Sequence, residues 1–234
     1  MNPAVKFDEG QIRREIKSKR PGIYELRILM TDFYKTVLSA YFDRDNPDQV
    51  IRQMLNWRYP ADCCINFYLT VNPVKHYCFS REQYDSIRKC RIMSQDDDIE
   101  RLTWLALDID PDHPAGTSAS NAEKAIAWDQ AQEVQRYMDE CGFEVPEVVD
   151  SGNGFHLKYR IDFPNDDNGR TIVSNLVDSL REQFPMIDPV VKNPARILKL
   201  PGTIAMKGRN TEERPFRPSY IIQDAGEVQE DNAE

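Results

Sequence analysis

The chain has 234 residues, of which 40% are hydrophobic and 29% are charged, and its formal net charge is −9 at pH 7. This length suits one large domain, or two closely joined lobes, with a substantial core. No stretch approaches the roughly 18 apolar residues of a membrane span, and residues 1–9 contain no apolar secretory region. Five cysteines, an odd number, suit a reducing compartment better than a disulfide framework. We therefore expect a cytoplasmic protein without a membrane segment.

The first 95 residues predict a small α/β lobe. Strands are expected at 23–29, 37–42 and 65–71, with helices at 45–57 and 81–91. The last strand should stop at Pro73, because proline cannot donate to a β-ladder.

Residues 102–110 form an almost continuously apolar stretch that ends in two carboxylates, Asp108 and Asp110. Such a stretch predicts a central strand that is covered on both faces. Side chains at i and i+2 of a strand point to the same face, so these carboxylates can aim at one point. Adjacent buried carboxylates are costly without a cation, and an oxygen-rich site suits Mg²⁺ or Mn²⁺. A calcium loop of the EF-hand type is excluded, because His113 and Ala119 occupy its glycine and glutamate positions.

The second half predicts alternating helices and strands. Ser120 and Glu123 have the spacing of a capping box, and a helix with apolar residues at helical spacing should run from there to Gly142. Strands are expected at 145–149 and 155–161, a helix at 170–184 and a short strand at 196–200. The turn Gly152-Asn-Gly154 is a strong hairpin signal. With the strand at 102–110, this order predicts a β-α-β-β-α-β arrangement of the split-βαβ type.

Charge is distributed unevenly along the chain. Residues 189–220 contain seven basic and two acidic residues, a local balance of +5, and residues 6–20 contain six basic and three acidic residues. Acidic residues gather at 96–100 and in the tail at 224–234, which is expected to be disordered or a truncated linker. A local basic segment permits contact with nucleic acid despite the acidic net charge.

The motifs, taken in order, resemble the archaeo-eukaryotic primase superfamily, in its primase-polymerase branch of phages and mobile elements. The family pattern of Asp-x-Asp, small-x-His and apolar-Asp is matched by Asp108-Ile-Asp110, Gly154-Phe-His156 and Ile187-Asp188. The resemblance continues in Glu25-Leu-Arg27, Val71-Asn-Pro-Val74, the Gly-Thr-Ser-Ala segment at 116–119 and residues 193–217. It therefore covers roughly residues 20 to 220.

The resemblance implies an α/β (α+β) primase-polymerase core with an RRM-like split-βαβ palm and an N-terminal α/β lobe. The expected catalytic domain is 1–223, with the lobe at about 1–95, the palm at about 96–223 and the acidic tail at 224–234. Two Mg²⁺ or Mn²⁺ ions are expected on Asp108, Asp110 and Asp188, while His156 is expected to contact the incoming triphosphate. The candidate nucleotide-binding residues are His156, Ser151, Arg196, Lys199 and Lys207. A regular strand would place Arg196 and Lys199 on opposite faces.

The implied activity is that of a nucleotidyltransferase, a DNA-directed primase-polymerase. Its partners would be a single-stranded DNA template and NTP or dNTP, with a replicative helicase in trans or in a further C-terminal region. Two alternatives stay open: a metal-dependent nuclease that uses the same acids, and a non-catalytic replication or single-strand DNA-binding module. The chain has no P-loop motif. The spacing of Cys63, Cys64, His76, Cys78 and Cys90 argues against zinc.

Overall fold

The computed structural model describes residues 4–89 and 92–225. Its helices are α1 (Glu9–Ser18), α2 (Asp48–Asn56), α3 (Asn121–Glu140) and α4 (Asp167–Gln183), with short 3₁₀ helices η1 (His76–Ser80), η2 (Asp96–Asp98) and η3 (Pro189–Lys192). Its strands are β1 (Ile23–Met30), β2 (Val37–Asp43), β3 (Ile65–Thr70), β4 (Arg88–Lys89), β5 (Arg101–Ile109), β6 (Glu147–Asp150), β7 (Phe155–Pro164), β8 (Ile197–Lys199), β9 (Ile204–Ala205), β10 (Arg217–Pro218) and β11 (Tyr220–Gln223).

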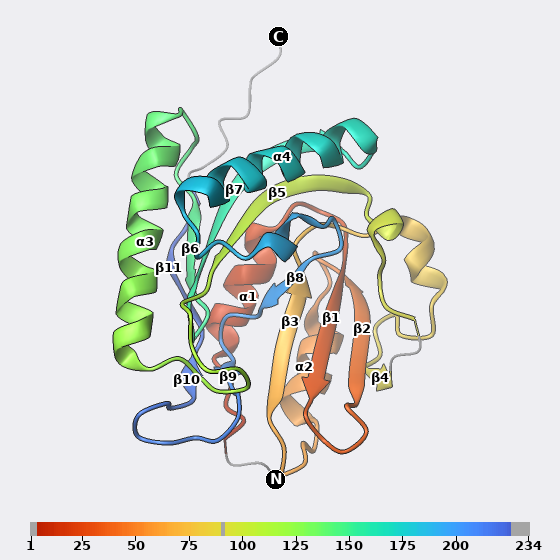
Figure 1. The fold of residues 1–234 in the computed structure, drawn as a ribbon. Helices are drawn as coiled ribbons and strands as arrows, with labels where there is room; N and C mark the ends of the chain where they lie inside the picture. Colours follow the sequence, from red (N-terminus) through yellow and green to blue (C-terminus); the bar gives the residue numbers. More distant parts are fainter. Residues whose placement is uncertain (1–3, 90–91, 226–234) are drawn as a thin grey trace.

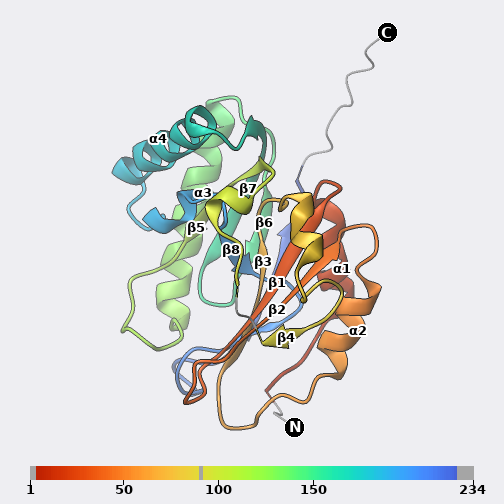
Figure 2. The same ribbon diagram turned by 90° about the vertical axis from the view of Figure 1, so that its right-hand side faces the viewer.

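The first of the two larger sheets has the strand order β4-β2-β1-β3-β8, and every neighbouring pair is antiparallel. Helices α1 and α2 cover one of its faces (Figures 1 and 2). Alternation along β3 explains this layer, because Phe67 and Leu69 belong to the core under the helices, whereas Asn66 and Tyr68 line a cleft.

The second sheet has the strand order β11-β6-β7-β5 and is also antiparallel. Helices α3 and α4 cover its outer face, where their apolar stripes form one core with Leu105, Leu107 and Leu157 (Figure 1). Within the described ranges, none of the helices is long and apolar enough to cross a membrane. The mixed α and β composition and the two antiparallel sheets confirm the predicted fold class.

Local signals placed most elements correctly. The capping box at the start of α3 is formed, since Ser120 Oγ accepts from the Glu123 N–H at 3.2 Å and the Glu123 carboxylate accepts from the Ser120 N–H at 2.7 Å. Gly142, in the left-handed region at φ 84°, follows the end of the same helix. The hairpin of β6 and β7 is formed as well.

Two predictions about local structure were wrong. The helix expected at 81–91 is a series of turns that leads into β4, and residues 90 and 91 lie outside the described residues. The strand expected at 196–200 exists as β8, but it pairs with β3 of the first sheet and not with the second sheet. The fourth strand of the second sheet, which we call the palm sheet, is β11, and it pairs with β6. A three-residue strand carries too few side chains to specify which sheet it joins.

Strand β5 was expected to be central but lies at the edge of its ladder. It is nevertheless covered on both faces, since Leu105 and Leu107 pack under the helices while Trp104 and Ala106 pack beside Leu198 on the other side. Because an edge strand leaves backbone groups without ladder partners, other parts of the chain must supply them.

The amide side chain of Asn72 supplies part of that cover. Its Oδ1 accepts from the Thr103 N–H at 2.8 Å and from the Trp104 N–H at 3.2 Å, at the place where the ladder register shifts. Its Nδ2 donates to the carbonyl of Pro194 at 3.2 Å. One side chain thus joins the end of β3, the edge of β5 and the segment that leads to β8.

Four buried charges join α1 to the palm sheet. Lys158 on β7 donates to both carboxylate oxygens of Glu15 at 2.8 Å and also contacts Glu147 on β6. Lys19 lies 3.1 Å from Glu15 and donates to the Val71 carbonyl at 3.3 Å. The two cations lower the pKa of Glu15 to about 2 in spite of burial, while burial raises the pKa of Glu147. Helix α1 therefore contributes charged as well as apolar side chains to the interior.

Candidate active site

The end of β5 and the segment before η3 run side by side. The Asp188 N–H donates to the Asp108 carbonyl at 2.8 Å, and the Asp110 N–H donates to the Met186 carbonyl at 3.1 Å. These bonds bring Asp188 next to Asp108 and Asp110, although about eighty positions separate them in the sequence. The side chain of Asp188 also caps η3, because its Oδ1 accepts from the Val190 N–H at 2.9 Å.

The hairpin turn before β7 fixes the end of β5. A Cβ atom at Gly154 would lie 2.2 Å from the Ile109 carbonyl oxygen and 2.7 Å from Asp110 Oδ1. Only glycine allows so close an approach. The space that a side chain at position 154 would need is occupied by the backbone of β5. Ser151 is also used in the turn, where its Oγ accepts from the Gly154 N–H at 3.0 Å.

The three carboxylates repel one another. Burial, followed by the charges of Asp110 and Asp188, raises the pKa of Asp108 well above its ordinary value. Asp110 reaches solvent, but its partial desolvation in the cleft is the main cause that raises its pKa, with a further contribution from Asp188. Arg196 and Lys207 act in the opposite direction on Asp108, and Lys207 does so on Asp110. The neighbouring cations therefore offset the repulsion within the cluster only in part.

His156 is the ladder partner of Asp108 on the adjacent strand, and its Nε2 lies 3.5 Å from Asp108 Oδ1. The ring is 3% exposed, and burial lowers the pKa of His156 to about 3. At neutral pH it is therefore an uncharged imidazole that offers one N–H donor and one acceptor. His156 can therefore serve a phosphate as a hydrogen-bond donor but not as a cation.

Asp108 and Asp110 line a cleft of about 690 Å³ between the two sheets. The predicted site residues that line this cleft are Asp108, Asp110, Ser151, His156, Arg196, Lys199 and Lys207. Asp188 is absent from the lining and approaches the cleft only through its backbone bond to β5. Residues of the earlier half, such as Asn66 and Tyr68, line the same cleft, so both halves of the chain contribute to it.

Arg196 and Lys199 both line this cleft, as do Ile197 and Leu198 between them. Alternation does not apply to them, because Arg196 precedes the first residue of β8. Arg196 Nε donates to Asn193 Oδ1 at 3.0 Å, and its other arm reaches the Val190 carbonyl. Lys199 is buried, and this burial lowers its pKa to about 7.

Sequence reasoning missed Asn66, which holds Lys199 and the backbone of Met206. Its Oδ1 accepts from Lys199 Nζ at 3.1 Å and from the Met206 N–H at 3.0 Å, and its Nδ2 donates to the Met206 carbonyl at 2.6 Å. The only signal was a carboxamide within the otherwise apolar stretch Ile65-Asn-Phe-Tyr-Leu69. Tyr68, on the same face of β3, also lines the cleft.

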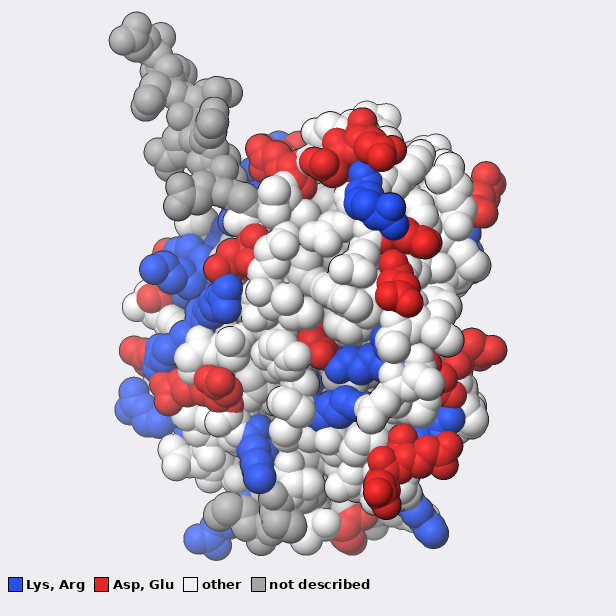
Figure 3. All heavy atoms as spheres, turned by 90° about the vertical axis from the view of Figure 1, so that its left-hand side faces the viewer, with Lys and Arg blue, Asp and Glu red and all other residues white. Residues whose placement is uncertain are grey.

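Much of the basic segment at 189–220 is engaged within the protein. Lys192 pairs with Asp178 at 2.7 Å, and Arg214 pairs with Glu123 at 2.7 Å. On the face drawn in Figure 3, basic and acidic side chains are interspersed over the surface. Positive charge available to a ligand is therefore a property of the cleft more than of the segment as a whole.

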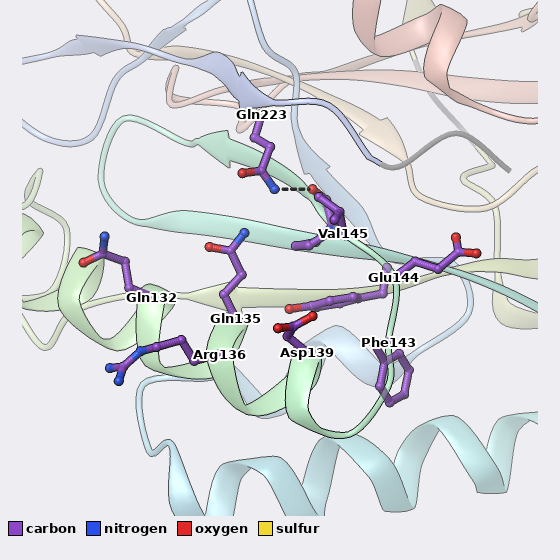
Figure 4. A pocket seen from close by; sticks show the side chains of 10 residues that line it. Gln132, Gln135, Arg136, Asp139, Phe143, Glu144, Val145 and Gln223 are labelled. Atoms are coloured by element: carbon purple, nitrogen blue, oxygen red, sulfur yellow. Dashed lines mark hydrogen bonds between the residues drawn. The ribbon is translucent and has the colours of Figure 1, made fainter.

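A second hollow, of about 560 Å³, lies between the C-terminal half of α3 and the end of β11 (Figure 4). Gln132, Gln135 and Arg136 line it, and Gln223 opposite donates to the Pro146 carbonyl at 3.0 Å. None of the predicted site residues takes part in it. We therefore assign the chemistry to the cleft that holds the acids.

The donor chemistry of the acid cluster fits a hard divalent cation. Carboxylate oxygens are the ligands that Mg²⁺ and Mn²⁺ prefer, and a cation would relieve the repulsion that raises the pKa of Asp108. As they stand, no three His, Cys, Asp or Glu side chains in the described part of the chain form a group able to hold a metal ion. Cys64 and Cys78 are not joined in a disulfide within the described residues, and Cys90 lies outside them.

No protein-family model matches the chain, and no curated protein matches it. Solved structures match its fold. The archaeo-eukaryotic primase domain of the primase-polymerase of cyanophage S-2L aligns with a TM-score of 0.51 and 15% identity over 96% of this chain and 94% of that chain. Primase RepB′ aligns with a TM-score of 0.52 and 10% identity over 92% of this chain and 56% of that chain.

The catalytic domain of primase RepB′, solved in complex with initiator DNA, aligns with a TM-score of 0.51 and 9% identity over 92% of this chain and 84% of that chain. At these identities the similarity establishes the fold. The chain thus has the archaeo-eukaryotic primase type of fold that the order of its motifs predicted.

Proposed function

We propose that this chain, which has the fold of primase-polymerase catalytic domains, is a template-dependent nucleotidyltransferase that forms phosphodiester bonds on single-stranded DNA. One observation carries the proposal. Acids from two distant segments meet beside a cleft that Arg196, Lys199 and Lys207 also line. A cleft lined by both acids and cations suits a nucleoside triphosphate with divalent metal.

In this proposal each side chain has a limited task. Asp108, Asp110 and Asp188 would hold two Mg²⁺ or Mn²⁺ ions, which when bound stabilise charge on the attacking and leaving oxygens. Arg196 and Lys207 would bind the triphosphate, Arg196 through its planar fork. His156 would donate its N–H to a phosphate oxygen. The buried Lys199, held by Asn66, would meet the triphosphate in a water-poor part of the cleft, where charge interactions are stronger.

The direct test uses the full chain, a labelled single-stranded template, nucleotides and either metal, with and without a primer. We expect template-directed incorporation that needs Mg²⁺ or Mn²⁺. Parallel reactions with NTP and dNTP identify the preferred sugar, and reactions without primer identify initiation. Shortening of the DNA without incorporation would instead support the nuclease alternative, and binding without either reaction would support a non-catalytic module. A helicase partner remains an expectation outside this test.

We expect His156→Ala to weaken the apparent affinity for nucleotide about tenfold, because it removes one hydrogen-bond donor from a buried position. Affinity for single-stranded DNA should stay within twofold of wild type. His156→Gln keeps an N–H donor and should retain most of the nucleotide affinity. Separate titrations of nucleotide and of DNA distinguish these results. Loss of DNA affinity with unchanged nucleotide affinity would reverse the assignment.

Nucleotide binding should also depend on pH through Lys199, whose pKa is lowered to about 7. The ammonium is charged below this pKa and loses its proton above it, so affinity for triphosphate should fall by about tenfold from pH 6.5 to 8.5. Lys199→Met should bind weakly and without this slope. Lys207→Met, at an exposed position, should keep the slope while binding more weakly overall. Equal slopes in all three proteins would assign the titration to the nucleotide alone.

A further inference from the structure

The turn between β1 and β2 carries two aromatic side chains in water. Phe33 is 93% exposed and Tyr34 is 78% exposed, more than any other large apolar side chain in the described residues. Their rings lie 5.2 Å apart between centroids, in an edge-to-face arrangement. Neither ring belongs to any of the three hydrophobic clusters of the described chain. We call residues 31–36 the aromatic turn.

The aromatic turn is held by its polar residues. Asp32 Oδ1 accepts from the Thr36 N–H at 2.6 Å, and its Oδ2 accepts from the Thr36 hydroxyl at 2.7 Å. The Lys35 N–H donates to the Asp32 carbonyl at 3.0 Å, and the Met30 N–H donates to the Thr36 carbonyl at 2.9 Å. These bonds define the turn without any contribution from the side chains at positions 33 and 34. The turn therefore presents two rings that its own folding does not need.

The aromatic turn borders the cleft. Thr31 lines the cleft, and its backbone N–H donates to the Cys64 carbonyl at 3.0 Å. Cys64 in turn contacts the loop after β9, because its Sγ donates to the Gly208 carbonyl at 3.2 Å. The β1–β2 turn and the loop after β9 lie at the same end of the molecule in both ribbon views (Figures 1 and 2). A ligand that leaves the cleft at this end passes the aromatic turn.

Charge around this end of the cleft favours a polyanion. The basic residues are Lys35 on the turn, Lys89 on β4, whose charge acts on Asp32, and Lys207 and Arg209 on the loop after β9. All four are exposed. The acids beside the turn are Asp32, which is bound to Thr36, and Asp62, whereas Lys207 also acts on Asp108 and Asp110 within the cleft. Exposed aromatic rings beside cations form the combination that binds single-stranded nucleic acid, with stacking on the bases and attraction to the phosphates.

We infer that Phe33 and Tyr34 form a stacking platform for unpaired bases of the single-stranded DNA template at the rim of the cleft. This inference rests on the proposed function, because that function brings the template to this cleft. Stacking would hold the strand without reading its sequence, since every base has a flat face. The platform would thereby keep the template extended next to Arg196, Lys199 and Lys207, the residues proposed to bind the nucleotide.

The test compares two oligonucleotides of equal length, one with bases and one made of abasic units with the same phosphates. Wild type should bind the base-containing strand at least about tenfold more tightly, because two rings stack on bases. Phe33→Ala/Tyr34→Ala in the full chain should lose most of this preference while its affinity for the abasic strand stays within twofold. Phe33→Tyr/Tyr34→Phe keeps both rings and should behave as wild type. Phe33→Leu/Tyr34→Leu, apolar without rings, should behave as the alanine variant.

Two results would overturn the platform. If wild type binds DNA and incorporates nucleotide but the alanine variant keeps the full preference for bases, this inference fails while the proposed function stands. If wild type neither binds DNA nor incorporates nucleotide, both fail. Light scattering of each protein provides the other readout. A wild-type dimer that becomes a monomer in the alanine variant, with DNA affinity unchanged, would assign the rings to contact between copies of the chain. Matching melting temperatures of the variants exclude misfolding as the cause.

Discussion

Asp108→Asn should reduce nucleotide incorporation by at least about a thousandfold, because two-metal catalysis depends on the carboxylate charge that this change removes. Asp110→Asn should have a similar effect. Binding of single-stranded DNA should persist in both variants, since the residues proposed to bind phosphate are unchanged. Single-turnover incorporation with saturating nucleotide and metal measures the loss. Wild-type turnover in either variant would remove these two residues from the chemistry.

The same substitution should stabilise the metal-free fold. The pKa of Asp108 is raised above its ordinary value, so the folded chain favours its protonated form. A carboxyl of this kind costs stability progressively as the pH rises from its unfolded pKa to its folded pKa, and the full cost is present at higher pH. Asparagine removes this cost, so Asp108→Asn should melt at a higher temperature at neutral pH without metal. Asp112→Asn, an exposed carboxylate two positions after Asp110, serves as the matched control and should change neither property.

Lys158→Met should lower the free energy of unfolding by about 3–5 kcal/mol, because it leaves two buried carboxylates with one cation fewer. Glu15 and Glu147 both contact the ammonium of Lys158, and all three side chains are at most 5% exposed. Chemical denaturation at neutral pH measures the effect. Arg13→Met breaks an exposed ion pair with Asp48 on the surface of α1 and should cost no more than about 1 kcal/mol. Equal losses of stability in the two variants would mean that Lys158, Glu15 and Glu147 are effectively solvated.

The chemical motifs were predictable because each depends on a short stretch of chain. The apolar strand before Asp108 and Asp110, the glycine turn before His156 and the capping box at Ser120 are all formed as their local patterns indicated. The adjacency of Asp188 to the other acids came from the family resemblance, since no local pattern joins positions so far apart. The structure supplies its physical basis in backbone bonds between the two segments.

The remaining features were not predictable because they depend on partners far away in the sequence. Helix α1 was missed because Glu15 and Lys19 look like surface residues, and only Lys158 and Glu147 explain their burial. The edge position of β5 was missed because the side chain of Asn72 replaces a neighbouring strand there. Lining of the cleft by both Arg196 and Lys199 depends on where β8 begins, which the printed residues do not reveal.

After the second sheet the chain returns to the first sheet at β8, so the two halves of the sequence do not fold into separate sheets. Strand β8 follows the acid Asp188 by nine residues and completes the first sheet beside β3. A fragment that stops near residue 95 would therefore expose one side of β3 and lack Lys199. The two halves cannot be exchanged between relatives as separate modules by a single crossover at that point, because the later half carries a strand of the earlier one. Recombination that keeps the cleft intact must transfer the whole chain through the loop after β9, where Lys207 and Gly208 complete the lining.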